Sequence, residues 1–179
     1  MSIEFRSDQI STGRRDRLVR RRLSLWDAEP PKHPRLMELY RYWESLRPEG
    51  LIPARTEFDI LKLRAVMGTT CVIDVDCPDP QDYLVRLYGT SLTLPNDMSN
   101  RTLKNMDFSD EYREMLAEDY FSAREIGVPL YHEVAALINY SMHTYARLIL
   151  PFAGDHRNVN QLIVCSVHQD FPDLVKLLD

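Results

Sequence analysis

The fold is decided by a stretch that reads Tyr-Trp-Glu-Ser-Leu-Arg at residues 42–47, Ile-Pro-Ala-Arg-Thr-Glu-Phe-Asp-Ile at 52–60 and Cys-Val-Ile-Asp-Val-Asp at 71–76. A second extended segment, Tyr-Leu-Val-Arg-Leu-Tyr-Gly-Thr, follows at 83–90. In the 71–76 segment the odd positions are apolar and two even positions are aspartates, a period of two that predicts a half-buried strand. Two prolines between the segments remove backbone donors and turn the chain, so the two segments predict a β-hairpin.

Further elements follow from the spacing of apolar residues on either side of this stretch. Apolar residues recur at three- and four-residue steps over 34–47, which predicts an amphipathic helix. Ser109 begins and Gly127 ends a second helical pattern, which has acidic residues in its first turn. Three more strands are predicted at 129–139, 143–152 and 160–169, followed by a short helix at 171–178.

Together these elements predict an α+β fold class. We expect a five-stranded antiparallel sheet with helices on one face, preceded by the N-terminal amphipathic helix. The domain is predicted to span 34–170, with a short C-terminal helix over 171–179. Residues 1–33 are predicted to form a polar, arginine-rich and flexible arm, which ends in the helix-excluding Pro-Pro-Lys-His-Pro.

Charge is unevenly distributed along the chain. The net charge is −5, yet residues 1–35 hold nine Lys and Arg against five Asp and Glu. The acidic total argues against nucleic acid as the partner of the whole chain. The arm alone suits RNA, anionic lipid or an acidic partner, and an alternative is that it lies on the acidic body of its own domain or of a dimer mate. Three unclustered cysteines and the absence of a run of about 20 apolar residues predict a cytoplasmic protein with reduced thiols and no membrane span.

The deciding stretch also contains a set of family motifs. They are the aromatic pair Tyr42-Trp43, the segment with Pro53, Arg55 and Asp59, and the strand end with Arg86 and Gly89-Thr90. With a later Leu-x-Leu-Pro at 148–151, the chain resembles a family of standalone bacterial PAS-like sensor domains over about residues 36–168. The resemblance implies a PAS fold and a sensory or adaptor role in bacterial signal transduction, and it implies no particular ligand.

Signatures of catalysis and of bound cofactors are missing from the sequence. There is no Gly-x-Ser-x-Gly elbow and no glycine-rich phosphate loop. The helix over 110–126 holds no His or Cys, although haem-binding PAS domains typically ligate iron from this helix, and the flavin-binding cysteine signature is absent. We therefore expect no cofactor, no metal and no enzyme activity. His132 shares strand parity with Val134, so we interpret it as a core or pocket-lining imidazole rather than a metal or haem ligand.

Three groups of residues are candidates for the functional surface. A mainly apolar pocket between sheet and helices is predicted to be lined by Leu103, Met106, Met115, Tyr120, His132 and Leu148. A homodimer interface on the first helix is predicted to use Leu36, Leu39, Tyr40 and Trp43, with cover of the chain's own sheet as the competing interpretation. A structural latch is predicted in which Arg55 or Arg86 pairs with Asp59, with an arginine free for an anionic ligand or a partner's carboxylate as the alternative.

These observations favour a non-catalytic cytoplasmic sensor or adaptor that acts on a protein partner through a ligand-modulated or a constitutive interaction. A ligand of the predicted pocket is expected to be small and apolar or weakly polar. Two alternatives remain open. The first is a small-molecule enzyme on the same scaffold, for which His132, Tyr120 and Tyr131 are the titratable candidates. The second is a nucleic-acid-associated regulator that uses the arginine-rich arm.

Overall fold

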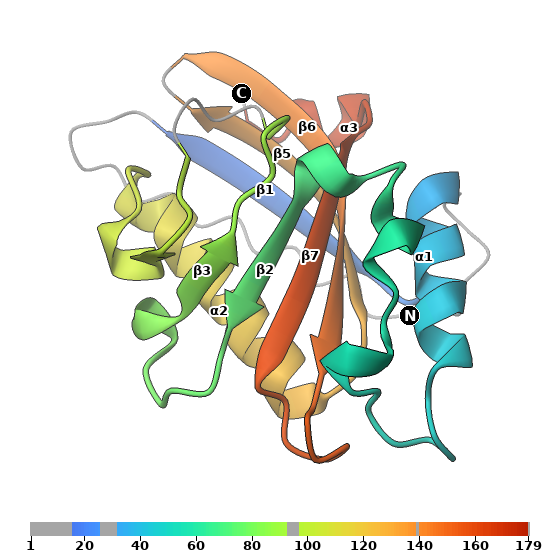
Figure 1. Cartoon of the computed structure of the whole chain (residues 1–179). Coiled ribbons are helices and arrows are strands. Elements are labelled where there is room, and N and C mark those ends of the chain that lie inside the picture. The colour runs from blue at the N-terminus through green and yellow to red at the C-terminus, as the bar shows by residue number, and fades with distance from the viewer. Residues whose placement is uncertain (1–15, 26–31, 93–96, 139, 179) are drawn as a thin grey trace.

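The computed structural model describes residues 16–25, 32–92, 97–138 and 140–178, and these form one antiparallel sheet with helices packed against it (Figure 1). The strands are β1 (Arg17–Leu23), β2 (Thr70–Asp74), β3 (Leu84–Leu87), β4 (Arg101–Thr102), β5 (Leu130–Ile138), β6 (Ser141–Phe152) and β7 (Gln161–His168). The α-helices are α1 (Pro34–Ser45), α2 (Asp110–Ile126) and α3 (Pro172–Val175). Short 3-10 helices are η1 (Arg55–Glu57), η2 (Ile60–Leu63), η3 (Met67–Thr69), η4 (Pro80–Asp82) and η5 (Leu103–Asn105). The strand order is β1-β5-β6-β7-β2-β3-β4.

The structure confirms the α+β fold class and most of the predicted elements. The hairpin of β2 and β3 is present, and β5, β6 and β7 lie close to their predicted bounds. The side chain of Ser109 accepts a hydrogen bond from the Tyr112 backbone N–H at the start of α2. Gly127 ends α2 in the left-handed region at φ 67°, a conformation that glycine adopts without steric cost. None of the described helices is long and apolar enough to cross a membrane.

The helices cover both faces of the sheet, instead of one face as predicted. One apolar core joins α2 and η5 to β2, β3 and one face of the central strands. A second core joins α1 and α3 to the opposite face of β5, β6 and β7 (Figure 1). The physical reason lies in the central strands, because residues 146–150 of β6 are buried without interruption and a strand buried on both faces needs cover on both.

The sheet has two strands more than the five predicted, and one of them corrects the prediction of a structureless arm. Within that arm, Arg17–Leu23 forms the edge strand β1 and pairs with β5 from Arg17 opposite Leu137 to Leu23 opposite Tyr131. Residues 1–15 and 26–31 of the predicted arm lie outside the described residues. The sequence pattern concealed β1 because four of its seven residues are arginines, and their acidic partners lie far away in the sequence.

Gly89 allows a close backbone approach at the end of the hairpin. A Cβ atom at this position would lie 2.4 Å from the carbonyl oxygen of Gly68 and 2.8 Å from the backbone nitrogen of Thr70. Both distances are shorter than van der Waals contact, so any side chain here would force the two backbone segments apart. The glycine of the Arg-x-x-Gly-Thr motif therefore sets how closely the end of the hairpin packs against the residues that precede β2.

Candidate functional site

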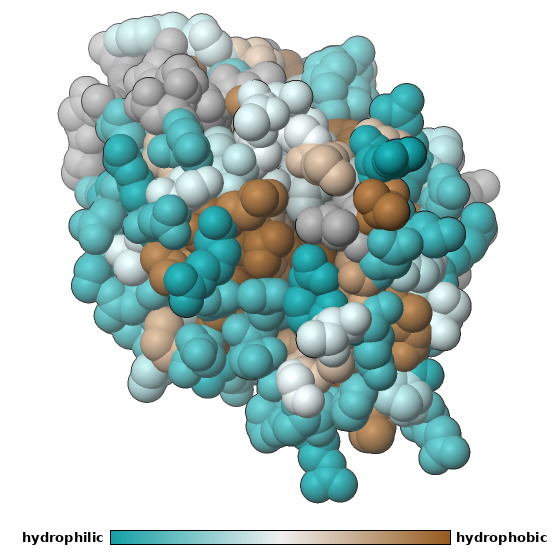
Figure 2. All heavy atoms as spheres, in the orientation of Figure 1, coloured by the Kyte–Doolittle hydropathy of each residue, from teal (hydrophilic) through white to brown (hydrophobic). Residues whose placement is uncertain are grey.

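A cavity of about 450 Å³ lies on the α2 face of the sheet. Its apolar lining includes Ile73, Leu103 and Leu116, and its rim includes the exposed residues Met142 and His168. Figure 2 shows hydrophobic side chains gathered in the region of β2 and β3, with hydrophilic side chains around them. A volume of this size is within the range of small-molecule pockets, so the cavity is the candidate binding site.

The cavity contains half of the residues that the sequence predicted for its lining. These are Leu103, Met106 and Tyr120. Met115 is buried on the same side of the sheet but is not part of the lining, and His132 faces α2 beside the cavity. The assignment of Leu148 is wrong, because this side chain lies in the core on the α1 side. Successive side chains of a strand point to opposite faces. Because Arg147 lines the cavity, the next residue, Leu148, points away from it.

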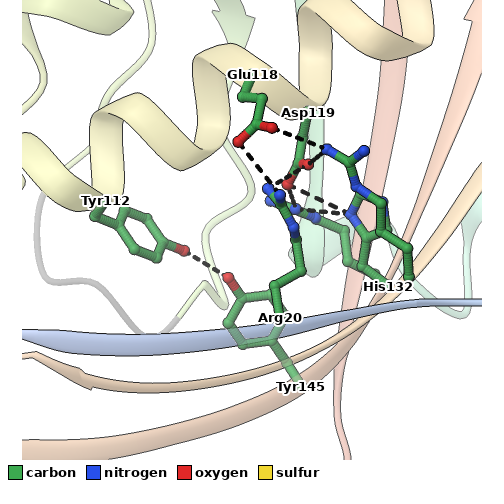
Figure 3. A network of polar contacts seen from close by, with 8 residues as sticks. Arg20, Tyr112, Glu118, Asp119, His132 and Tyr145 are labelled. Carbon is green, nitrogen blue, oxygen red and sulfur yellow. Dashed lines mark hydrogen bonds and ion pairs between the residues drawn. The ribbon is translucent and has the colours of Figure 1, made fainter. Parts of the chain in front are cut away.

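Buried charged side chains from β1, β6 and α2 meet beside the cavity (Figure 3). The carboxylate of Asp119 on α2 accepts hydrogen bonds from Arg20 and Arg147 and forms a further ion pair with Arg22 at 3.1 Å. Glu118 adds ion pairs to Arg20 at 3.3 Å and to Arg22 at 3.6 Å. We call these five residues the Asp119 cluster. It connects the long helix to the edge strand β1 and to the central strand β6.

The register of the sheet explains why these side chains meet. Arg22 of β1 lies opposite His132 of β5, and His132 lies opposite Arg147 of β6, so all three point to the α2 face. On α2, Asp119 lies four residues after Met115 and four residues before Ala123, within the buried stripe of the helix. The helix therefore places one carboxylate directly above a row of basic side chains.

Electrostatics fix the charge states in the cluster at neutral pH. Burial alone would raise the pKa of Asp119, but the adjacent His132, Arg147 and Arg20 outweigh it, and the pKa lies below its usual value. Burial lowers the pKa of His132 to about 4, so its imidazole is neutral. Its Nδ1 lies 2.9 Å from Nη2 of Arg147, and an arginine can only donate. Nδ1 is therefore the acceptor, and Nε2 holds the imidazole proton.

A pH dependence of stability follows from His132. In the unfolded chain its imidazole binds a proton near pH 6.5, whereas in the folded chain it does so only near pH 4. The unfolded state therefore binds more protons between these values, so stability falls as the pH decreases through this window. We expect the wild type to lose roughly 3 kcal/mol more of its unfolding free energy between pH 7 and pH 4 than the His132→Asn variant does.

Urea unfolding at a series of pH values measures this difference. The asparagine keeps a hydrogen-bond acceptor for Arg147 near the position of Nδ1. Burial also lowers the pKa values of His33 and His143, but both side chains are present in the two proteins, so their contributions cancel in the comparison. Parallel pH profiles for the two proteins would contradict the expectation.

Tyrosine hydroxyls provide the neutral polar groups of the cavity. The hydroxyls of Tyr112 on α2 and Tyr145 on β6 lie 2.7 Å apart and form a hydrogen bond (Figure 3). Burial raises the pKa of both side chains, and of the nearby Tyr120, so all three are neutral phenols. A phenol both donates and accepts, so this end of the cavity can hold a polar group of a ligand.

The predicted latch between Asp59 and an arginine is wrong. Arg86 forms its ion pair with Asp74 across the β2–β3 hairpin. Arg55 donates to the carbonyl oxygen of Phe58 at 3.2 Å. Asp59 accepts from the Leu61 backbone N–H at 2.9 Å at the start of η2, and its own backbone N–H donates to the Tyr42 hydroxyl. Within the described residues no ion pair joins Asp59 to either arginine, and Arg86 is paired instead with an acid on the neighbouring strand of the hairpin.

The four residues predicted for a dimer interface are buried within the single chain. Leu36, Leu39, Tyr40 and Trp43 belong to the core on the α1 side of the sheet. The indole Nε1 of Trp43 donates to the carbonyl oxygen of Pro151 on β6 at 2.8 Å. These side chains therefore cover the chain's own sheet and are not available to a second chain, while the homodimer itself stays a prediction.

Sequence reasoning missed Arg20, Asp119 and Arg147, which form the centre of the cluster. A signal was present for two of them. Asp119 is in phase with the apolar stripe of α2, and Arg147 alternates in phase with the buried Ile149 and the partly buried Tyr145 of β6. A charged residue in phase with a buried face indicates a buried ion pair or a ligand contact, because an isolated buried charge is too costly.

Comparisons with known proteins complete the description of the site. In the described part of the chain, no group of three or more His, Cys, Asp or Glu side chains is placed to hold a metal ion. No curated protein and no solved structure matches the chain. Residues 31–163, which include α1, most of the cavity lining and the Asp119 cluster apart from its β1 arginines, match the family model of the PAS domain, and the chain therefore belongs to the PAS domain family.

Proposed function

We propose that this protein is a sensor that binds a small molecule in the cavity and passes the signal to a protein partner, without catalysis of its own. Membership of the PAS domain family supports a sensory or signalling role. The observation that carries the proposal is the cavity of about 450 Å³ between α2 and the sheet, with a mostly apolar lining and a few polar groups. This combination is typical of sites that bind small organic molecules.

The connections of α2 support a route by which a bound ligand alters the surface. Tyr112, Leu116 and Tyr120 of α2 line the cavity, and Asp119 of the same helix binds the arginines of the edge strand β1. A ligand that moves α2 therefore changes the contacts of β1. Edge strands present free backbone groups to partners, so we propose β1 and its neighbourhood as the surface that a protein partner reads.

The lining favours binding over catalysis. Cys71 is the cysteine in the lining, and burial raises the pKa of its thiol to about 12, so it is protonated at neutral pH and a poor nucleophile. The arginines of β1 also favour this function over nucleic-acid binding. Arg20, Arg21 and Arg22 are held in ion pairs with acidic residues of their own chain.

Binding of a neutral fluorophore tests the proposal. N-Phenylnaphthylamine, which gains fluorescence in apolar surroundings, should bind the wild type in equimolar amount. Leu116→Trp places a large side chain at the cavity wall and should abolish binding, whereas Phe121→Trp adds the same ring to the exposed side of α2 and should leave it unchanged. Equal binding by both folded variants, or no binding by the wild type, would contradict a ligand site in this cavity.

A further inference from the structure

Arg147 lines the cavity with hydrogen-bond donors that the described part of the chain leaves unpaired. Its side chain is only 2% exposed, and Nη2 makes the contacts with Asp119 and His132. Nε and Nη1 are buried and have no hydrogen-bond partner among the described residues. An unmade hydrogen bond on a buried guanidinium costs stability, so such donors in a cavity wall indicate that an acceptor from a ligand completes them.

The charges around Arg147 do not balance. The Asp119 cluster contains three arginines and two carboxylates, and His132 is neutral at pH 7 because burial lowers its pKa to about 4. The excess of one positive charge is the same if only the side chains that are less than 10% exposed are counted, because these are the two cations Arg20 and Arg147 and the one carboxylate Asp119. The site therefore holds one positive charge more than its own acids neutralise, and a buried excess charge is stabilised by a counter-charge.

We propose that the cavity binds an organic monocarboxylate, whose carboxylate accepts hydrogen bonds from Arg147 and whose hydrocarbon part lies against the apolar lining. This inference rests on the proposed function of the cavity as a ligand site. Tyr112 and Tyr120 of α2 and Tyr145 of β6 belong to the same lining as Arg147, and their hydroxyls can donate to the second carboxylate oxygen. Leu103, Met106 and Leu116 provide the apolar contacts.

The same observations exclude ligands with more charge. A phosphate monoester or a dicarboxylate brings about two negative charges, and the excess at the site is one. Among the described residues of the lining, Arg147 is the cationic side chain apart from the histidines, so a second ligand charge would be buried without a partner there. An uncharged ligand, in turn, leaves the charge excess and the donors of Arg147 unmatched.

Matched ligand pairs test the charge of the ligand in the full-length wild-type protein. Octanoate and decanoate are compared with octanol and decanol by displacement of N-phenylnaphthylamine and by calorimetry. A hydrogen bond to a charged group predicts that each carboxylate binds about ten to a hundred times more tightly than its alcohol. In Arg147→Met the carboxylates and the alcohols should bind with nearly equal affinity, while the affinity for the alcohols changes by less than about threefold from the wild type.

Each other outcome overturns a defined part of the inference. Alcohols that bind the wild type as tightly as carboxylates refute the monocarboxylate and leave the ligand site intact. An unchanged preference in folded Arg147→Met refutes the role of Arg147. If that variant does not fold, the wild-type pairs alone decide. Failure of the fluorophore, the alcohols and the carboxylates together refutes the ligand site itself, and the proposed function with it.

Discussion

Replacing Asp119 with alanine is expected to lower the free energy of unfolding by about 3–5 kcal/mol, because it removes the shared acidic partner of buried basic groups. The Asp119 side chain is fully buried and binds Arg20, Arg22 and Arg147. Without it, the one hydrogen-bond partner that Arg147 keeps among the described residues is His132, and that side chain is neutral. The measurement is urea or guanidinium unfolding followed by circular dichroism at pH 7.

Glu118 provides a matched control on the same helix. Its carboxylate also pairs with Arg20 and Arg22, at 3.3 and 3.6 Å, but its side chain is 40% exposed. Water screens such a pair, so Glu118→Ala should cost no more than about 1 kcal/mol. Similar losses for the two variants would show that the buried position of Asp119 does not matter, and the cluster would then not be the polar centre of the fold.

Local patterns predicted most of the elements because their signals lie within single segments. The alternation of apolar residues over 71–76 and the caps Ser109 and Gly127 of α2 each depend on neighbours a few positions away. Strand parity also placed His132 on the face toward the helices, where the structure has it. The order of these elements predicted the antiparallel sheet, which the structure has, and the family model confirms the resemblance to PAS domains.

The parts that sequence could not predict depend on pairs of residues that lie far apart. Arg20 and Asp119 are 99 positions apart, and Arg21 and its partner Glu133 are 112 apart. Arg20, Arg21 and Arg22 each look like a solvated charge until the acidic partner is known, so the sequence predicts a polar arm for this segment. For the same reason the polar end of the cavity was missed while its apolar wall was partly found. Burial of a charge is a property of the pair, and neither member alone predicts it.

Replacing Trp43 is expected to have the second large effect on stability. It also distinguishes the two interpretations of α1, which are cover of the chain's own sheet and a homodimer interface. Its side chain is fully buried, packs in the core on the α1 side and donates to the Pro151 carbonyl oxygen at 2.8 Å. Trp43→Ala should lower the free energy of unfolding by about 3–5 kcal/mol, as for other large core side chains. Trp43→Phe keeps most of the apolar volume but loses the indole donor, so it should lose less. Arg41→Ala, on the exposed side of the same helix, should be within about 0.5 kcal/mol of the wild type.

Protein concentration then decides whether Trp43 acts within one chain. A residue of the chain's own core lowers stability by the same amount at every protein concentration. A residue of an interface between two copies acts through association, so its effect on the thermal midpoint grows as the protein becomes more concentrated. Because the structure seats Trp43 on β6 of its own sheet, we expect the difference between Trp43→Ala and the wild type to be constant over a hundredfold range of concentration. If the difference in thermal midpoint between Trp43→Ala and the wild type increased with concentration, the apolar residues of α1 would instead lie at an interface between two chains.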